Sequence, residues 1–197
     1  MTPAIAVFLK APRLGRVKTR LAGEIGDRHA LRLYRLMAAR TLAAVRETGL
    51  EATVWFAPAD AGAELRYWLG DGWSLRPQAS GDLGARLAAS THAIEAGRGW
   101  IALGGDCPAI TAEVILEASA IVGRGEIAIG PTLDGGYYLL GGRTPLPDLF
   151  SGIPWSTERV LMETRARLAR VGAAWQELPV LRDVDTAADA RAEGLLT

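Results

Sequence analysis

The sequence predicts an α/β fold in which a mostly parallel mixed sheet is covered by helices on both faces. Apolar runs of strand length recur along the chain, and segments with the apolar spacing of an amphipathic helix lie between most of them. Strands that are apolar on both faces are typical of sheets buried between two helical layers. We therefore expect a three-layer αβα sandwich. A chain of 197 residues suits a single such domain over residues 1–197.

The strands are predicted from short apolar runs. In chain order these are residues 4–9, 52–57, 100–105, 126–131, 137–142 and 175–180. In open sheets of this kind, ligands bind beyond the carboxyl ends of the strands. The segments that follow the strands are therefore where functional residues are expected.

The helices are predicted from the spacing of apolar residues. In residues 27–49 one stripe contains Leu31, Tyr34, Met37, Ala38, Leu42 and Val45, and the segment ends in a glycine. Residues 82–97, 111–123 and 156–172 show the same spacing. Each of these segments lies between two predicted strands, as an α/β fold requires.

The composition argues against several functional classes. Lys and Arg number 22 and Asp and Glu number 22, whereas a general binder of nucleic acid or membrane surfaces needs a wide positive field. One cysteine excludes an intramolecular disulfide and a cysteine-cluster metal site. No apolar stretch approaches the roughly 20 residues of a membrane span, and the first positive charges lie on the wrong side of the apolar run for a secretory signal. We expect a soluble cytoplasmic protein; a homodimer is compatible with this sequence, but no segment locates its face.

A basic loop follows the first predicted strand. Residues 8–22 contain no acid and five cations, namely Lys10, Arg13, Arg16, Lys18 and Arg20. Pro12 and Gly15 interrupt regular structure there, so that backbone amides and cations can converge on a diphosphate or triphosphate. The loop is neither a Walker A motif nor a GxGxxG motif. The alternative is a basic face that is simply solvated.

The segment GGDCPAIT, residues 104–111, places a carboxylate at the end of a predicted strand. Asp106 follows two glycines there, and Thr111 can cap the next helix. Mg²⁺ takes one or two carboxylates together with phosphate oxygens and water, so Asp106 is a candidate metal ligand. The alternative role is hydrogen bonding within a turn. Cys107 is expected to be a small buried residue.

The segment LRDVDTAADA, residues 181–190, carries further carboxylates. Thr186 and Asp189 have the spacing of a helix-capping pair. Asp183 and Asp185 alternate, so both point to one side of an extended chain. Either of them could complete a metal site with Asp106.

Three further segments combine turns with polar or aromatic side chains. Asp134, Gly135 and Gly136 form a turn in which the backbone can approach a ligand closely, and Tyr137 follows. In residues 153–160, Trp155 could stack on a sugar or base, and Ser156 or Thr157 should cap a helix. In residues 77–87, Gln78 and Asp82 could read a base edge. Each segment also has a structural explanation as a turn, a helix cap or a buried aromatic residue.

In this order the motifs resemble an uncharacterised family of the nucleotide-diphospho-sugar transferase superfamily. Its members have the GT-A-like fold and are provisionally labelled glycosyltransferases. The motifs are KxPxxGxxKTRL, GGDCP, PxxDGGYYLLG, PWST and DVDT, and the match runs from about residue 4 to 190. More distantly, KTRLA and DVDTAADA are similar to 2-phospholactate guanylyltransferases, and GGDCP is similar to the metal-bearing turn of molybdenum-cofactor guanylyltransferases.

The resemblance implies a nucleotide half over about residues 1–110 and an acceptor half over about 111–197. It implies that the nucleotide is bound by Leu9, Lys10, Ala11, Arg13, Gly15, Lys18, Gln78, Gly81, Asp82 and Gly84. It implies that Mg²⁺ or Mn²⁺ is bound by Asp106 and Asp185, with Asp183 as the alternative to Asp185. It implies that the acceptor is bound by Asp134, Gly135, Gly136, Tyr137, Trp155 and Ser156. The catalytic residues would be Lys18, Asp106 and Asp134.

Three functions are compatible with these residues. The first is nucleotidyl transfer from an NTP to a small phosphorylated or acidic acceptor, because a departing pyrophosphate needs several cations. The second is glycosyl transfer from an NDP-sugar to a small acceptor, with Asp134 as base. The third is a non-catalytic nucleotide-binding domain, which should have lost a loop cation or a metal-binding acid. The sequence does not decide the base, the sugar or the acceptor.

Overall fold

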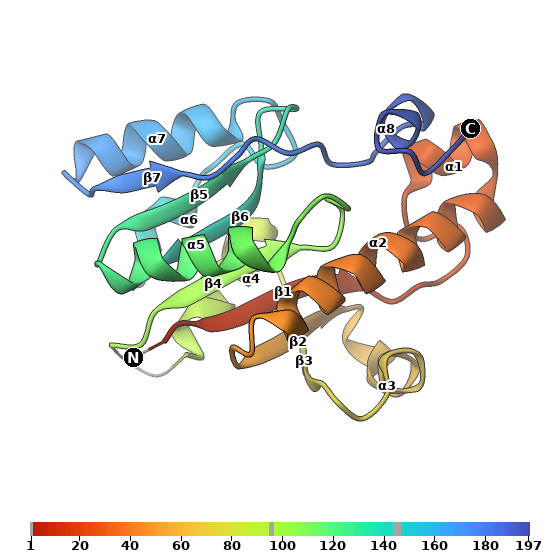
Figure 1. Ribbon diagram of the computed structural model, residues 1–197, viewed down its shortest axis with the longest axis horizontal. Helices are drawn as coiled ribbons and strands as arrows, with labels where there is room; N and C mark the ends of the chain where they lie inside the picture. Colours follow the sequence, from red (N-terminus) through yellow and green to blue (C-terminus); the bar gives the residue numbers. More distant parts are fainter. Residues whose placement is uncertain (1, 95–96, 144–146) are drawn as a thin grey trace.

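The computed structural model is a three-layer αβα sandwich, which confirms the predicted fold class (Figure 1). It describes residues 2–94, 97–143 and 147–197. The strands of the central sheet are β1 (Ala4–Lys10), β2 (Ala52–Ala57), β3 (Ser74–Pro77), β4 (Trp100–Gly104), β5 (Ile127–Pro131), β6 (Tyr137–Gly142) and β7 (Trp175–Glu177). They lie side by side in the order β3-β2-β1-β4-β6-β5-β7.

Strand direction decides which loops come together. β1 is parallel to its neighbours β2 and β4, whereas β6 is antiparallel to both β4 and β5. The carboxyl ends of β1, β4 and β5 therefore share one edge of the sheet with the start of β6. The turn between β5 and β6 lies at this edge as well. We refer to it as the carboxyl edge.

Helices cover both faces of the sheet (Figure 1). They are α1 (Thr19–Ile25), α2 (Asp27–Glu47), α3 (Gly62–Leu69), α4 (Leu83–His92), α5 (Ala112–Gly123), α6 (Pro147–Phe150), α7 (Val160–Arg170) and α8 (Ala187–Ala192), with a 3₁₀ turn η1 (Ala59–Ala61) before α3. In the ranges that the structure describes, no helix has the length and apolar character needed to cross a membrane.

Two apolar cores separate the layers. α2 and α5 pack on one face of the sheet, around Val7 of β1 and Leu103 of β4. α4, α6 and α7 pack on the other face, around Ala6 and Ala102. Because neighbouring residues of a strand point to opposite faces, both faces of β1 and β4 are buried. This burial explains why these strands are apolar without alternation.

The predicted elements are present, with differences at their ends. β7 ends at Glu177 rather than at residue 180, and α7 begins at Val160 rather than at residue 156. α4 ends at His92, and residues 95–96 of the predicted helix 82–97 lie outside the described residues. The sequence did not indicate β3, because this four-residue edge strand (SLRP) is mostly exposed and carries no apolar run.

Gly84 lies where α4 approaches the end of α6 and the chain that follows it. A Cβ atom at Gly84 would overlap the carbonyl oxygen of Phe150 and would lie 2.7 Å from Nε1 of Trp155. Gly84 is buried, and the overlap with a backbone carbonyl cannot be relieved by turning a side chain. The absence of a side chain at this position therefore allows α4 to approach that segment.

Gly84→Ala is expected to destabilise the protein by about 1–3 kcal/mol, because overpacking shifts neighbouring backbone. Urea unfolding followed by circular dichroism measures the change. The matched control is Gly23→Ala in α1, where a Cβ would meet nothing within 4 Å. This control should gain about 0.5–1 kcal/mol from helix propensity. Equal stability of Gly84→Ala and wild type would show that α4 does not need this close approach.

Candidate active site

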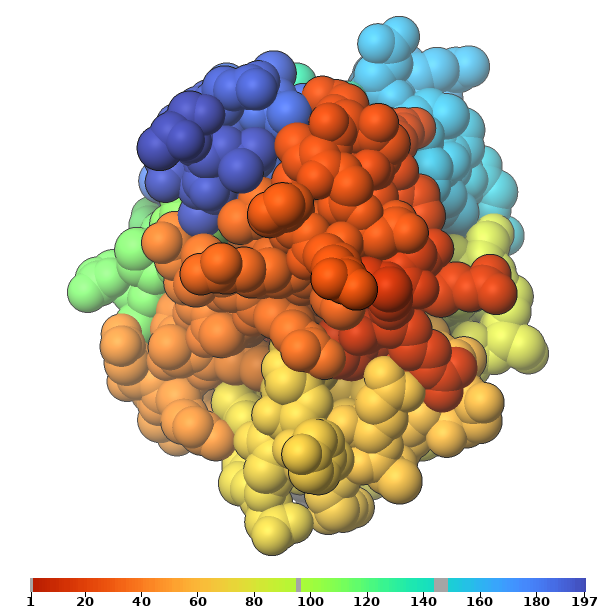
Figure 2. All heavy atoms as spheres, turned by 90° about the vertical axis from the view of Figure 1, so that its right-hand side faces the viewer, coloured from red at the N-terminus to blue at the C-terminus, as the bar shows by residue number. Residues whose placement is uncertain are grey.

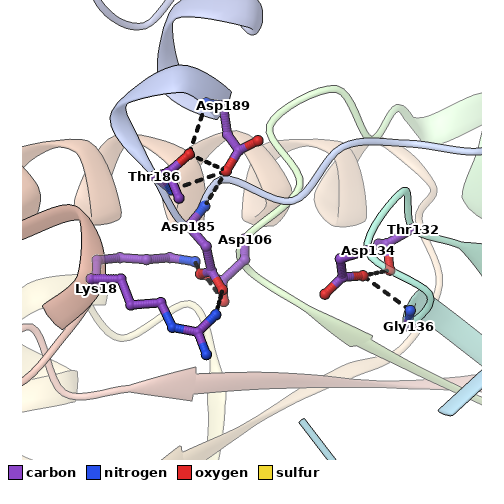
Figure 3. A network of polar contacts seen from close by, with 9 residues as sticks. Lys18, Asp106, Thr132, Asp134, Gly136, Asp185, Thr186 and Asp189 are labelled. Carbon is purple, nitrogen blue, oxygen red and sulfur yellow. Dashed lines mark hydrogen bonds and ion pairs between the residues drawn. The ribbon is translucent and has the colours of Figure 1, made fainter. Parts of the chain in front are cut away.

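Three charged side chains from distant parts of the sequence meet at the carboxyl edge (Figure 3). Lys18 Nζ lies 3.0 Å from Oδ2 of Asp106 and 2.9 Å from Oδ1 of Asp185. The side chain of Lys18 is 5% exposed, whereas those of Asp106 and Asp185 are 48% and 40% exposed. The ammonium is thus enclosed, and the two carboxylates remain open to solvent on one side.

The backbone brings the two carboxylates together. Asp106 follows directly from β4 through two glycines. The C-terminal segment first pairs with β5, through the N–H of Leu178 on the carbonyl of Ile129, and then crosses to the turn after β4. There the N–H of Val184 donates to the carbonyl of Asp106 at 3.1 Å. This bond places Asp185 beside Asp106.

The helix that follows holds Asp185 in place. Thr186 and Asp189 form a capping box at the start of α8, which confirms the predicted capping pair. Oδ2 of Asp189 accepts hydrogen bonds from the N–H groups of Asp185 and Thr186, at 3.3 Å and 3.0 Å. Figure 3 shows this cap above the contact between Asp185 and Lys18.

Lys18 has an unusual backbone. Its φ of 47° and ψ of 49° are left-handed, a region that costs a non-glycine residue roughly 1–2 kcal/mol. Burial alone would lower the pKa of Lys18, but the charges of Asp106 and Asp185 outweigh burial and raise it. The ammonium is therefore charged at neutral pH, and its ion pairs offset the backbone cost.

Asp183 takes a different position from Asp185. Burial, together with the charges of Asp134 and Asp185, raises the pKa of Asp183 to about 6. The ion pairs of Lys18 involve Asp185 and Asp106.

Among the described residues, no three His, Cys, Asp or Glu side chains are grouped so that they could hold a metal ion together. A divalent cation at Asp106 and Asp185 would need its other ligands from substrate and water.

A first cavity of about 190 Å³ opens onto this cluster. It is lined by Lys10, Val17, Lys18, Thr19, Arg20, Tyr34, Asp106 and Asp185. The hydroxyl of Tyr34 accepts from the N–H of Lys10 at 2.8 Å and donates to its carbonyl at 2.7 Å. Tyr34 thereby fixes Lys10, the last residue of β1. Lys10 extends beyond the end of the neighbouring strand β4, whose last residue pairs with Phe8.

A second cavity of about 550 Å³ adjoins the first. It is lined by Lys10, Ala11, Arg13, Arg16, Ala57, Pro58 and Arg86. Lys10 lines both cavities. Arg13 is also paired with Glu64, at 2.8 Å, and with Asp60, at 3.4 Å. The loop cations therefore line two adjoining cavities, one of which also contains the carboxylates, and the basic loop and the carboxylates meet as the sequence predicted.

Arg86 was not among the predicted site residues. Its Nε donates to the carbonyl of Gly81 at 3.0 Å, and its Nη1 donates to Oε1 of Gln78 at 3.3 Å. These bonds direct the guanidinium from the first turn of α4 toward the second cavity. The available signal is its position: Arg86 follows the glycine-bearing turn of residues 77–84, which is predicted to contact the nucleotide.

Several residues predicted to contact the nucleotide are used within the fold. Nε2 of Gln78 donates to the carbonyls of Leu9 and Trp55, at 3.2 Å and 2.9 Å, so this amide nitrogen links β1 and β2. Oδ1 of Asp82 accepts from the N–H of Ala85 and caps α4. Gly84 packs against Trp155.

The remaining loop residues have equally local surroundings. The side chain of Leu9 lies in the core, and the N–H of Ala11 donates to the carbonyl of Ala57 at 2.7 Å. Gly15 and Gly81 have φ values of 69° and 105°, which favour glycine, so both residues shape turns. Cys107 is buried, as predicted.

The residues predicted for the acceptor form two groups. Asp134 lies at the carboxyl edge, where its Oδ1 accepts from Thr132 Oγ1 at 2.6 Å and from the N–H of Gly136 at 3.0 Å (Figure 3). Its neighbour Gly135 lies against the backbone of Glu158, and its carbonyl accepts from the N–H of Leu161. The close approach expected of this turn is therefore made to the segment before α7.

The aromatic residues of the second group are partly buried and pack against one of the apolar cores. Tyr137 packs edge-on against Trp155, with ring centroids 6.3 Å apart, and burial raises its pKa. The prediction that Ser156 or Thr157 caps α7 was wrong, because the helix begins only at Val160, with Arg159 as N-cap. Ser156 has a φ of 63°, and Thr157 Oγ1 donates to the carbonyl of Pro154, so both residues belong to a preceding turn.

The view onto the end of the molecule shows how the chain is arranged around the site. In Figure 2 the basic loop with α1 lies between the C-terminal segment on one side and the residues around α7 on the other. Segments from both ends of the sequence therefore form this face.

Solved structures share this fold. A Desulfovibrio desulfuricans G20 protein, provisionally described as a nucleotide-diphospho-sugar transferase, is 32% identical over 98% of this chain and 87% of its own, with a TM-score of 0.92. The inositol-1-phosphate CTP transferase of T. maritima is 11% identical, covering 98% of this chain and 94% of its own, with a TM-score of 0.65. Rv0371c of Mycobacterium tuberculosis H37Rv, in complex with manganese, is 20% identical, covering 99% of this chain and 98% of its own, with a TM-score of 0.61.

These likenesses confirm the predicted nucleotide-diphospho-sugar transferase fold. A comparison with curated proteins finds no match. Residues 41–157 match a family described as uncharacterised proteins conserved in bacteria, DUF2064. The chain belongs to this family.

Proposed function

We propose that this protein is a nucleotidyltransferase that moves a nucleotidyl group from an NTP to a small phosphorylated or acidic acceptor. An oxygen of the acceptor phosphate or carboxylate would attack the α-phosphorus. The bond from that phosphorus to the bridging oxygen would break, and pyrophosphate would leave with the electron pair. The observation that carries the proposal is the pair of adjoining cavities: one is lined by Lys18 and two carboxylates, and the other by three arginines.

The cations suit a triphosphate. Lys10 lies where the two cavities meet, and Arg16 and Arg86 line the larger one. Charge-assisted hydrogen bonds to phosphate are short and strong, so these side chains would hold and orient the polyphosphate. Lys18 would neutralise charge that develops on the departing pyrophosphate. Most of the rate enhancement would come from positioning and electrostatics, as in other phosphoryl-group chemistry.

The two carboxylates fit a hard divalent cation such as Mg²⁺ or Mn²⁺. Their oxygens already converge on one cation, the Lys18 ammonium, at 3.0 Å and 2.9 Å. Mg²⁺ is commonly bound by one or two carboxylates with substrate phosphates and water. When bound by Asp106 and Asp185, it would add positive charge beside the phosphate oxygens. The complex of Rv0371c with manganese supports this assignment.

The acceptor would enter from the side of the second half of the chain, residues 111–197. Asp134 lies at the same edge of the sheet as Asp106 and contributes to the raised pKa of Asp183. A carboxylate there could orient the acceptor. The name of the T. maritima neighbour, a CTP transferase acting on inositol-1-phosphate, supports a phosphorylated acceptor.

Glycosyl transfer from an NDP-sugar is the second candidate. The 32% identity to the Desulfovibrio protein, with its sugar-transferase description, favours it. In that reaction Asp134 would accept the proton of an acceptor hydroxyl. A purely nucleotide-binding role is less well supported, because Lys18, Asp106 and Asp185 are all retained and converge.

Product analysis separates the two reactions. The four NTPs, UDP-glucose and GDP-mannose are first compared, with and without Mg²⁺, for their effect on the melting temperature. A ligand at about 100 Kd adds close to 3 kcal/mol of stability. The stabilising nucleotide is then incubated with a mixture of sugar phosphates and polyol phosphates. Release of pyrophosphate supports nucleotidyl transfer, and release of NDP alone would favour glycosyl transfer instead.

Asp106→Asn should lower turnover by roughly 100-fold or more, because it removes a charge that faces the reacting phosphates. The matched control is Asp71→Asn. The side chain of Asp71 is 94% exposed, and its ion pair with Arg66 is long, at 4.0 Å. Pyrophosphate release measures the rate, and the melting temperature checks folding. Wild-type turnover in Asp106→Asn would remove Asp106 from the site.

Arg86→Met should weaken nucleotide binding by about tenfold, the loss of roughly one charge-assisted hydrogen bond. Calorimetry with the stabilising nucleotide measures the dissociation constant. Arg66→Met removes the same charge from an exposed side chain outside both cavities and should bind normally. If Arg86→Met binds as tightly as wild type, the second cavity does not hold the nucleotide.

A further inference from the structure

Lysine is used very selectively in this chain. The sequence contains twenty arginines and two lysines, Lys10 and Lys18. Both lysines line the same cavity at the carboxyl edge. Everywhere else a cation is required, arginine supplies it. Both side-chain ammonium groups of this chain therefore lie at the site, and an ammonium differs from a guanidinium in more than its charge.

The surroundings of Lys18 suit an ammonium better than a guanidinium. An ammonium is a compact point charge on a flexible four-carbon stem, whereas a guanidinium is a planar fork. Nζ of Lys18 fits between Asp106 and Asp185 with contacts of 3.0 Å and 2.9 Å. Arg20, which approaches Asp185 from outside, reaches only 3.7 Å, and its side chain is 76% exposed. Lys18 therefore occupies the position between the carboxylates, and Arg20 does not.

Two features make this arrangement suited to exchange. The carboxylates are 48% and 40% exposed, so they can accept another cation without unfolding. Lys18 has a flexible four-carbon stem, so its ammonium can move without a change in the backbone. The cavity that it lines also contains Lys10, which reaches the larger, arginine-lined cavity.

We infer that Lys18 is a displaceable counter-ion, which holds the carboxylate pair in the resting protein and leaves it when a divalent cation binds there. This inference rests on the proposed function and adds its regulation. A phosphate in the cavity would attract the released ammonium. Nucleotide and divalent cation would then bind with positive coupling, because each favours the same displaced position of Lys18. A divalent cation alone would bind weakly.

The first test uses Mn²⁺ alone and measures its dissociation constant by electron paramagnetic resonance. Lys18→Met and Lys18→Asn should bind Mn²⁺ about tenfold more tightly than wild type, a typical size for the coupling between two bound groups. Lys18→Asn is included because asparagine tolerates a left-handed backbone. Arg20→Met removes an equal charge beside the same Asp185 and should change the constant far less. The Lys18→Asn/Asp106→Asn double variant should lose the gain.

Unchanged or weaker Mn²⁺ binding by both folded Lys18 variants would overturn the inference. So would an equal gain in Arg20→Met, because the effect would then be one of general charge. Neither outcome bears on pyrophosphate release by the wild-type protein, so the proposed function would still stand or fall on its own test.

The second test needs no substitution. The two lysines can be methylated reductively and distinguished by mass spectrometry, with the exposed Lys10 as an internal reference. Lys18 should react slowly in the metal-free protein, because its ammonium is enclosed and paired. Saturating Mn²⁺ should raise the Lys18-to-Lys10 labelling ratio severalfold. An unchanged or lower ratio would show that Lys18 stays between the carboxylates.

Discussion

The ammonium of Lys18 joins the two ends of the chain at one point. Its partner Asp185 is 167 residues away in sequence, and Asp106 lies between them at the end of a central strand. Without a cation in this position, two carboxylates would face each other across a half-enclosed space, where like charges repel. This ion pair, together with the apolar packing of Val184 and Ala187 against Leu21, holds the C-terminal segment beside the basic loop and shapes the first cavity.

Charge is sorted along the carboxyl edge although the protein as a whole is neutral. The larger cavity is lined by arginines that come from the loop after β1 and from α4, and the smaller one has the carboxylates. The arginine-lined cavity suits a group with several negative charges, and the cavity with the carboxylates suits a cation bound next to that group. This arrangement follows from the parallel pairing of β1 and β4, whose carboxyl ends lie side by side. The basic loop follows β1 and Asp106 follows β4, so positive and negative side chains become neighbours.

The sequence predicted the layers and the charged centre of the site, because both leave local signals. Buried strands are apolar throughout, and Lys18, Asp106 and Asp185 each follow a recognisable turn or strand end. Residues whose role depends on tertiary partners could not be assigned in this way. Gln78 and Gly84 look the same in sequence whether they contact a ligand or other parts of the chain, and only the structure shows that Gln78 links two strands. Arg86 was missed for the converse reason: its position after the glycine-bearing turn is a local signal, but only the structure shows that its side chain lines a cavity.

The C-terminal segment has a further consequence. From Leu178 to α8 it crosses the sheet edge as an extended chain, attached by a few backbone hydrogen bonds, such as that between Val184 and Asp106, and by the buried side chains of Leu178 and Val184. Segments attached in this way detach at a much lower free energy than core strands do. Amide hydrogens around Val184 should therefore exchange with solvent well before those of β1 and β4. One wall of the first cavity is therefore expected to open while the sandwich beneath it remains folded.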